Sequence, residues 1–297
     1  MNIRWDRESM VSWSSLRKAI YTLFPLLIYF LIHDMSEILL WGGLNMFMGN
    51  AKESTNTFLI ENAYTIRGIV NGLAILCGVA VTWKGVKEEI SWGKNNAQEH
   101  KREKNSDQKI RNEKDSKGKI DEKMLTGYMF LVALAFLSAL GFNLLFYLIG
   151  FTESSESFTQ TATAQFGVDF VMGILLYGIL SPFAEEAVFR GLIYNRMKRC
   201  FNLPVALTVS SLLFGCYHGN LVQAVYGTIL GLLMAYVYER YESFAAPVLF
   251  HAVSNMSIYI LAYGNSFAEI DHSISIVMTV ICLAGAAGCL FLLVRRK

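Results

Sequence analysis

The chain has 297 residues, of which 54% are hydrophobic and only 17% are charged, and its mean hydropathy is +0.37. A soluble domain would carry about a quarter charged residues, so the composition argues against a soluble domain and indicates a membrane protein. The formal net charge of +2 is too small to indicate nucleic-acid binding. Five cysteines, most of them inside apolar runs, predict buried thiols and no disulfide framework.

Apolar segments of roughly 20 residues, the length that a helix needs to cross a bilayer, recur along the chain. The first is too long for the apolar region of a signal peptide, so we expect it to be retained as a helix. We therefore predict an all-α integral membrane protein that crosses the plasma membrane several times. About eight transmembrane helices are expected, the fifth of them short, at residues 19–41, 66–83, 125–149, 167–187, 203–217, 221–238, 244–262 and 273–294.

A charged segment at residues 84–123 separates the second and third predicted helices. It contains 12 Lys and Arg, 9 Asp and Glu, and almost no aliphatic residues. Such a segment buries too little apolar surface to offset the entropy lost on ordering, so we expect a solvated or loosely helical cytoplasmic loop. It is either a plain linker or a docking element. It divides the chain into an N-terminal pair of membrane helices (1–83) and a second membrane region (124–297).

The distribution of Lys and Arg predicts the orientation, because cytoplasmic loops of membrane proteins are rich in these two residues. With a cytoplasmic N-terminus and eight helices, 24 of the 26 Lys and Arg fall on the cytoplasmic side. Lys52 and Arg67 are the two that remain for the far side. Both termini are therefore predicted to be cytoplasmic.

Ionisable side chains inside a membrane are costly, by about 2.5–3.5 kcal/mol on insertion scales, and mark candidate sites. Glu185, Glu186 and Arg190 lie at the end of the fourth apolar run. Glu186 and Arg190 are spaced i,i+4 and can pair on one helix face, whereas Glu185 points about 100° away and has no such local partner. This asymmetry predicts a charged, supporting Glu186 and a Glu185 that is free to act as a base.

Two later apolar segments each carry a histidine. Phe214 and His218 are spaced i,i+4 and share a helix face, and the same spacing directs His251 and Asn255 at one neighbour. A glutamate, two histidines and an asparagine in a water-excluded site supply a base and donors for an oxyanion, which suits amide hydrolysis.

The depths of these side chains in the membrane can be compared by counting residues. A hairpin that turns near residues 200–202 sets Glu185 level with His218, because its two helical arms are nearly equal in length. The depth of His251 stays open. Either residues 218–223 are not helical, or the helix that carries His251 starts at a different height.

Taken in chain order, the motifs are EExxxR (Glu185, Glu186 and Arg190), FxxxH (Phe214 and His218) and HxxxN (His251 and Asn255). This set resembles the CPBP family, which groups type II CAAX prenyl proteases with bacteriocin-processing and bacteriocin-immunity membrane proteins. The resemblance covers about residues 169–260, and the N-terminal half resembles the family only as generic membrane helices.

The resemblance implies that Glu185 activates the attacking water with help from His218, which Phe214 positions. Glu185, His218 and His251 are also candidate ligands for a divalent metal such as zinc. No HExxH motif is present to supply two histidines and a base from one helix turn. A metal-free mechanism uses the same residues, so both alternatives stay open.

The remaining roles also follow from the resemblance. Glu186 and Arg190 would support the base, while His251 and Asn255 would polarise the scissile carbonyl and stabilise the oxyanion. The chain would then be an intramembrane endopeptidase, reached from within the bilayer or from the cytoplasmic face. Its substrates would be prenylated CAAX-type tails, secreted peptides or other membrane-associated proteins.

Less specific interpretations remain. Glu185, Glu186 and Arg190 could be a solvated helix end, and His251 with Asn255 could be an interhelical hydrogen-bonding pair. A non-catalytic bacteriocin-immunity or scaffolding protein is the main alternative, and a transporter with a proton relay is a further one. Outside the motifs, His33, Asp34 and Glu37 near the outer end of the first helix are either a second site or residues of the far interface.

Overall fold

The computed structural model describes residues 10, 12–106, 117–263 and 271–295, and these residues contain helices and no strand. The elements on either side of the central segment are α2 (Ser15–Asn50), α3 (Glu53–Glu61), α4 (Ala63–Ser106), α5 (Lys117–Leu148), α6 (Glu156–Phe166), α10 (Leu203–Tyr217), α11 (Leu221–Tyr241), α12 (Ala245–Tyr263) and α13 (His272–Arg295). The central segment is continuous helix, made of α7 (Phe170–Gly173), η1 (Ile174–Leu180), α8 (Ser181–Glu186), η2 (Ala187–Tyr194) and α9 (Asn195–Cys200).

Seven helical segments in the described part of the chain are long and apolar enough to cross a membrane. They are Ser15–Asn50, Ala63–Asn96, Met124–Leu148, Phe170–Cys200, Leu221–Tyr241, Ala245–Tyr263 and His272–Arg295. The remaining predicted span, the fifth along the chain, is α10, an apolar helix of 15 residues. The prediction of an all-α, multi-pass integral membrane protein is therefore confirmed, with seven full-length candidate spans and one short helix.

The charged segment is helical in its described part. α4 continues from its apolar part to Ser106, and α5 begins at Lys117. Residues 107–116 lie outside the described residues. The physical reason is that extending a helix is much easier than nucleating one. Lys, Arg, Glu and Gln are good helix formers, and no proline interrupts residues 84–123.

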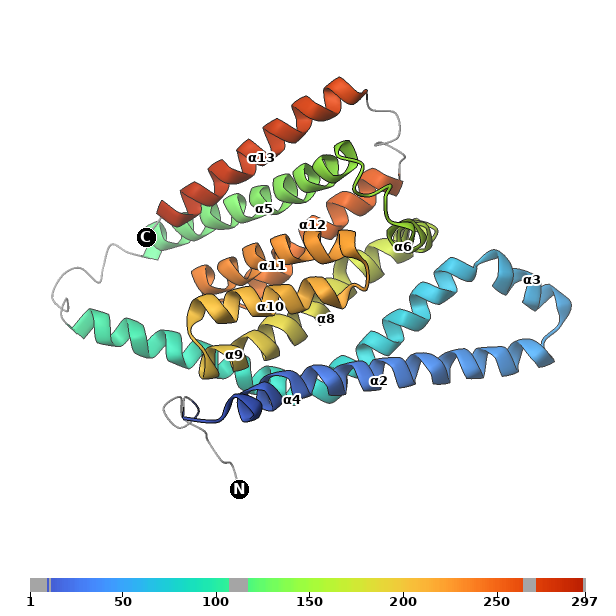
Figure 1. Cartoon of the computed structure of the whole chain (residues 1–297), viewed down its shortest axis with the longest axis horizontal. Coiled ribbons are helices and arrows are strands. Elements are labelled where there is room, and N and C mark those ends of the chain that lie inside the picture. The colour runs from blue at the N-terminus through green and yellow to red at the C-terminus, as the bar shows by residue number, and fades with distance from the viewer. Residues whose placement is uncertain (1–9, 11, 107–116, 264–270, 296–297) are drawn as a thin grey trace.

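The helices pair as neighbours along and across the chain. α2 packs on α4, α5 packs on α13 and on α12, and α10 packs on α11. α2 and α4 diverge toward one end, where α3 joins them (Figure 1). The short helices α3 and α6 lie at one end of the bundle, and α9 lies at the other (Figure 1). The hydropathy pattern missed α3 and α6 because these two helices are short and polar.

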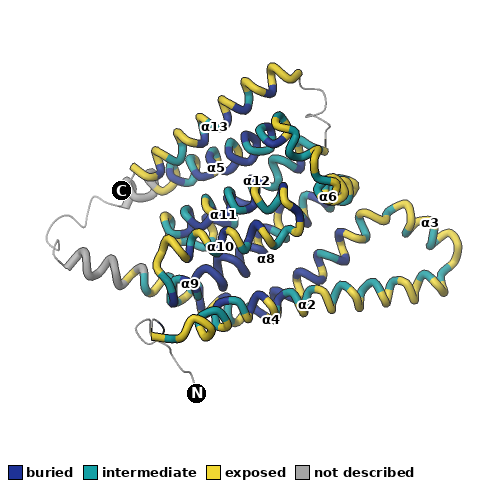
Figure 2. The backbone as a smooth tube through the Cα atoms, viewed as in Figure 1, coloured by how far each residue is buried: buried dark blue, intermediate teal, exposed yellow. Residues whose placement is uncertain are grey.

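Burial identifies the centre of the bundle. Every residue of η2 is buried, whereas α3 and α6 contain no buried residue. Buried positions gather around α8 and its neighbours, and the outer half of α2 is exposed or intermediate (Figure 2). The central segment, residues 170–200, is therefore the helix that the others surround.

Candidate active site

The central segment departs from regular α-helix on both sides of Glu185 and Glu186. α8 carries both glutamates and lies between the two π-helices η1 and η2. Pro182, at the start of α8, has no N–H to donate to the preceding turn, which helps to explain the change in hydrogen-bonding pattern. π-Helical turns are rare and often lie at functional sites.

Glu186 is held in a buried ion pair. Its Oε1 atom accepts a hydrogen bond of 2.7 Å from Nη1 of Arg190 and lies 2.9 Å from Nδ1 of His251. The side chains of Glu186 and Arg190 are 0% and 1% exposed. A buried charge without a partner would be strongly destabilising, so each of these groups requires the other.

Arg190 has two further contacts that fix its position. Its Nη2 atom donates to the carbonyl oxygen of Gly231 at 3.1 Å, and its guanidinium carbon lies 4.4 Å from the centre of the Phe214 ring. A Cβ atom at Gly231 would lie 3.3 Å from Nη2 of Arg190, so the absence of a side chain allows this close approach. The arginine thus connects α11, α10 and the central segment.

Glu185 has a different environment. Its Oε1 atom accepts a hydrogen bond from the hydroxyl of Ser181. Its Oε2 atom is buried and has no hydrogen-bond partner among the described residues. The Nε2 atoms of His218 and His251 lie 3.9 Å and 3.8 Å from Oε2, which is too long for direct hydrogen bonds.

The hydrogen bonds of the two imidazoles assign their tautomers. Nδ1 of His218 lies 2.9 Å from the carbonyl oxygen of Phe214, and since a carbonyl only accepts, Nδ1 carries the hydrogen. Nδ1 of His251 faces Glu186, whose carboxylate also only accepts when ionised. In the neutral rings both Nε2 atoms are therefore acceptors, and both face the acceptor Oε2 of Glu185. A water molecule in the cavity has two O–H donors to offer these acceptors.

Phe214 and Asn255 complete the motifs. Phe214 is 2% exposed and contacts both imidazoles edge to face, with ring centres 5.0 Å from His218 and 5.5 Å from His251. Asn255 donates from Nδ2 to the carbonyl oxygen of Tyr177 at 3.1 Å. His251 and Asn255 thus reach the same neighbouring segment, as their spacing predicts, but contact different residues of it.

These side chains border one cavity of about 390 Å³. Glu185, His218, His251 and Asn255 lie in its wall, and the rest of the wall is mainly aromatic and aliphatic, with a few amides and hydroxyls. A largely apolar cavity of this size with convergent polar groups is typical of a ligand or substrate site.

The structure resolves the open question of depth. Residues 218–220 are not helical, and Gly219 has φ of 74°. His251 lies only six residues after the start of α12 but still reaches Glu185, so α12 also starts at a different height from α10. The first alternative therefore holds for residues 218–220 only, because α11 begins at Leu221, and the second holds for α12. The site contains all three ionisable side chains.

Some neighbours of Glu185 were missed by the sequence analysis. Ser181 precedes Glu185 by four residues, so the i,i+4 rule could have identified it. Tyr29 of α2 could not have been found in this way, because it lies far outside the motifs. Its side chain is 1% exposed, and its hydroxyl has no hydrogen-bond partner in the described chain. Tyr29 lies near Tyr217 and interacts electrostatically with Glu185.

The metal-binding alternative can be compared with this geometry. Within the described residues, no group of three or more His, Cys, Asp or Glu side chains is arranged to hold a metal ion. Glu185, His218 and His251 point toward one another, with each Nε2 atom 3.8–3.9 Å from Oε2. The three residues do not form a preassembled ligand set, and we derive no step through a metal.

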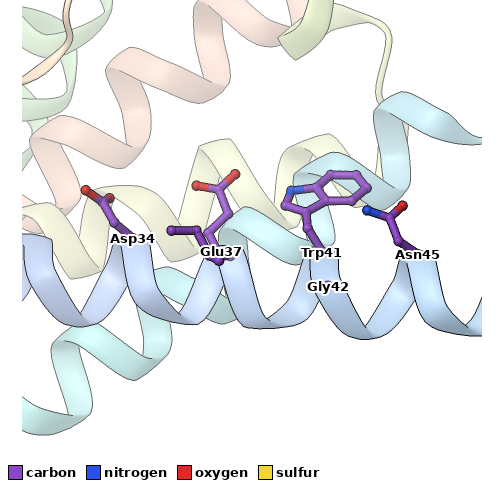
Figure 3. Close-up of a pocket in the computed structure, with 6 residues that line it drawn as sticks. Asp34, Glu37, Trp41, Gly42 and Asn45 are labelled. Carbon is purple, nitrogen blue, oxygen red and sulfur yellow. The ribbon is translucent and has the colours of Figure 1, made fainter.

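The residues His33, Asp34 and Glu37 lie apart from this cavity. Nδ1 of His33 lies 2.9 Å from Asp34, and its Nε2 lies 3.1 Å from the amide oxygen of Asn71 in α4. Asp34 and Glu37 point from one face of α2, together with Trp41, into an open groove of about 610 Å³ (Figure 3). This groove shares no lining residue with the cavity at Glu185.

The fold and the site together define a class: a multi-pass α-helical membrane protein with a buried carboxylate and imidazole site of the kind that hydrolases use. The family described as type II CAAX prenyl endopeptidase Rce1-like matches residues 167–257, a range that contains all three motifs. The second half of the chain is therefore similar to this family, in agreement with the resemblance that the three motifs carry.

A curated relative agrees with this assignment. The Bacillus subtilis (strain 168) protein named "Putative membrane peptidase YdiL" is 28% identical over 88 residues. The match covers 30% of this chain and 36% of the relative, so it spans about a third of the relative's length. No solved structure matches the chain. Together the comparisons support a membrane protease-like protein.

Proposed function

We propose that the chain is an intramembrane endopeptidase that hydrolyses a peptide bond of a membrane-associated or prenylated substrate with a water molecule activated by Glu185. The observation that carries the proposal is the buried Oε2 atom of Glu185, which has no hydrogen-bond partner among the described residues and faces Nε2 of His218 and His251 across the cavity. A carboxylate in this position can accept a proton from a water molecule that also donates to His218.

In the proposed reaction the water oxygen attacks the scissile carbonyl carbon as its proton passes to Glu185. The C–N bond of the tetrahedral intermediate then breaks, and the same proton passes from Glu185 to the leaving amine. The products are a new carboxyl terminus and a new amino terminus. His218 orients the water through Nε2, because its Nδ1 hydrogen is bonded to the carbonyl of Phe214.

Two groups are placed to stabilise the negative charge on the carbonyl oxygen. When both ring nitrogens of His251 carry hydrogen, Nδ1 donates to Glu186 and Nε2 donates to the oxyanion. Asn255 has two N–H donors and uses one for Tyr177, which leaves the second for the oxyanion. Donors of this kind are each worth about 2.7–4 kcal/mol of transition-state stabilisation.

Glu186 is unsuited to act as the base. It is fully buried and its Oε1 atom is engaged by both Arg190 and His251. Glu185 has one oxygen held by Ser181 and the other turned to the cavity. Two adjacent carboxylates thus have different environments, and this difference separates a supporting role from a catalytic one.

The test is a quantitative comparison of membrane and secreted peptides from cells that carry the wild type or Glu185→Gln. This substitution keeps the size of the side chain and removes its basicity. Glu37→Gln is the matched control, because Glu37 lines the separate groove on α2. We expect one or more uncleaved precursors to accumulate with Glu185→Gln and not with Glu37→Gln.

Equal peptide profiles for wild type and Glu185→Gln, at equal protein levels, would refute the proposal. If Glu185→Gln also retained a protective effect against a bacteriocin, the non-catalytic immunity alternative would be favoured.

A further inference from the structure

The cavity extends from Glu185 toward one end of the bundle, the end where α3 and α6 lie (Figure 1). Its wall includes the last turns of α5 and α12, the first turns of α11, and one face of α6. These helix ends meet at the same end of the bundle because consecutive helices run in opposite directions.

α6 covers this end of the cavity. Phe158, Ala162, Gln165 and Phe166 follow the i, i+4, i+7, i+8 spacing of one helix face and line the cavity. The opposite face of α6 is exposed, and none of its residues is fully buried. α6 is therefore a thin cover between the cavity and the surroundings.

The exposures of the two histidines indicate where the cavity opens. The side chain of His218 is 21% exposed, whereas that of His251 is 5% exposed. His218 lies at the start of the turn between α10 and α11, at the end that carries α6. Access to Glu185 therefore lies on the His218 side.

The cavity is closed between the two glutamates and the end of the bundle that carries α9. All eight residues of η2, which follow Glu186, are buried. Beyond them, Arg199 and Arg196 of α9 lie 2.9 Å and 3.4 Å from the carboxylate of Glu89 in α4. Tyr21 of α2 donates to the same carboxylate at 3.0 Å. Packed side chains and this ion cluster separate the cavity from the end that carries α9.

Charge distinguishes the two ends. At the end with α3 and α6, the described basic residues are Lys52 and Arg67, and the acidic residues include Glu53, Glu61, Glu153, Glu156, Asp169 and Asp271. The end with α9 carries Arg17, Lys18, Lys84, Lys87, Lys94, Arg196, Lys198, Arg199, Arg240 and Arg295. By the positive-inside rule, the α9 end faces the cytoplasm.

From this juxtaposition we infer that the cavity opens to the non-cytoplasmic side of the membrane, beneath α6. Its substrate is a polypeptide segment whose scissile bond is presented in the outer half of the membrane, as in an exported or membrane-anchored polypeptide. This inference rests on the proposed endopeptidase function. It narrows the substrate class, because a prenylated tail in the cytoplasm approaches from the closed end.

The experiment measures which side of the membrane reaches the cavity. Single cysteines are introduced by Gln165→Cys in the cavity wall, Glu53→Cys on α3 and Lys94→Cys at the opposite end, after the five native cysteines are replaced by serine or alanine. Intact cells are treated with a membrane-impermeant maleimide. We expect Gln165→Cys and Glu53→Cys to be labelled in intact cells and Lys94→Cys to be labelled only after permeabilisation.

Labelling of Gln165→Cys only after permeabilisation would overturn the inference, and so would its absence from both preparations. An epitope inserted after Glu153, beside the cavity-lining Thr152, tests the same orientation in the chain with its native cysteines. Neither the labelling nor the epitope readout needs catalysis. If Glu185→Gln left the cellular peptides unchanged and Gln165→Cys was labelled from outside, the proposed protease function would be rejected and the inferred opening of the cavity would be retained. External labelling of an active Gln165→Cys protein should also abolish cleavage, whereas labelling of Glu53→Cys should not.

Discussion

The buried pair of Glu186 and Arg190 gives the most quantitative prediction. Arg190→Met removes the 2.7 Å ion pair, the hydrogen bond to Gly231 and the contact with the Phe214 ring. The carboxylate of Glu186, 0% exposed, then lacks its arginine. Removing one partner of a buried ion pair costs about 3–5 kcal/mol, and we expect a loss of that size in the free energy of unfolding.

A double-mutant cycle separates the ion pair from packing. Glu186→Gln alone should also be destabilising, because it leaves the guanidinium of Arg190 buried and unpaired. The double variant should lose less than the sum of the two single losses, since no uncompensated charge remains. The measurement is thermal unfolding of the full chain in detergent, where each kcal/mol corresponds to about 2–4 °C for a chain of a few hundred residues.

Arg67→Met is the matched control, because Arg67 is exposed at the end with α3. Its effect should stay within about 1 kcal/mol, as for other exposed charges. A similarly small effect of Arg190→Met, or strict additivity in the cycle, would refute the assignment of Glu186 as a buried, charged support.

Three further predictions concern packing and catalysis. Gly215→Ala should destabilise the chain by about 1–3 kcal/mol, because a Cβ atom there would overlap the hydroxyl of Thr228. Gly43→Ala is the control, because a Cβ atom at Gly43 would meet no heavy atom within 4 Å in the described chain. It should be neutral or stabilising in the same melting assay. Asn255→Ala should lower kcat by about 10²–10³ with little change in KM, and an effect confined to KM would contradict an oxyanion role. Ser181→Ala should lower kcat less than tenfold, as about 0.5–1.5 kcal/mol is typical of one hydrogen bond, and a complete loss of activity would contradict an accessory role for Ser181.

The membrane architecture could be predicted because it depends on local composition. Long apolar segments gave the all-α fold and the approximate position of each span. The ends of the helices were less predictable, because α4 continues into a charged sequence that forms a helix once the apolar part has nucleated it. The short helices α3 and α6 carry too few apolar residues to give a spanning signal.

The candidate site could be predicted where its contacts are local. The ion pair of Glu186 with Arg190 and the contact of Phe214 with His218 are both spaced i,i+4. The contact of His251 with Glu186 joins residues 65 positions apart and depends on the height at which α12 starts. Tyr29 shows the same limit, because only the packing of α2 brings it near Glu185.

The opening of the cavity also required the structure. Counting charges assigns a side to each loop, but it does not indicate which helix ends line a cavity. The lining by α6 and the full burial of η2 provide that information. They support the inference that the substrate approaches from the non-cytoplasmic side, whereas the sequence predicted an approach from within the bilayer or from the cytoplasmic face.

The central claim is that Glu185 activates the water that cleaves the peptide bond. The most direct measurement is the turnover of purified full-chain wild type and Glu185→Gln on one peptide identified from the cellular comparison, with equal melting temperatures as the control for folding. We expect kcat to fall by about 10²–10⁴ with Glu185→Gln, the range of general-base catalysis. A Glu185→Gln protein that cleaves the same bond at a rate similar to that of the wild type would contradict this claim.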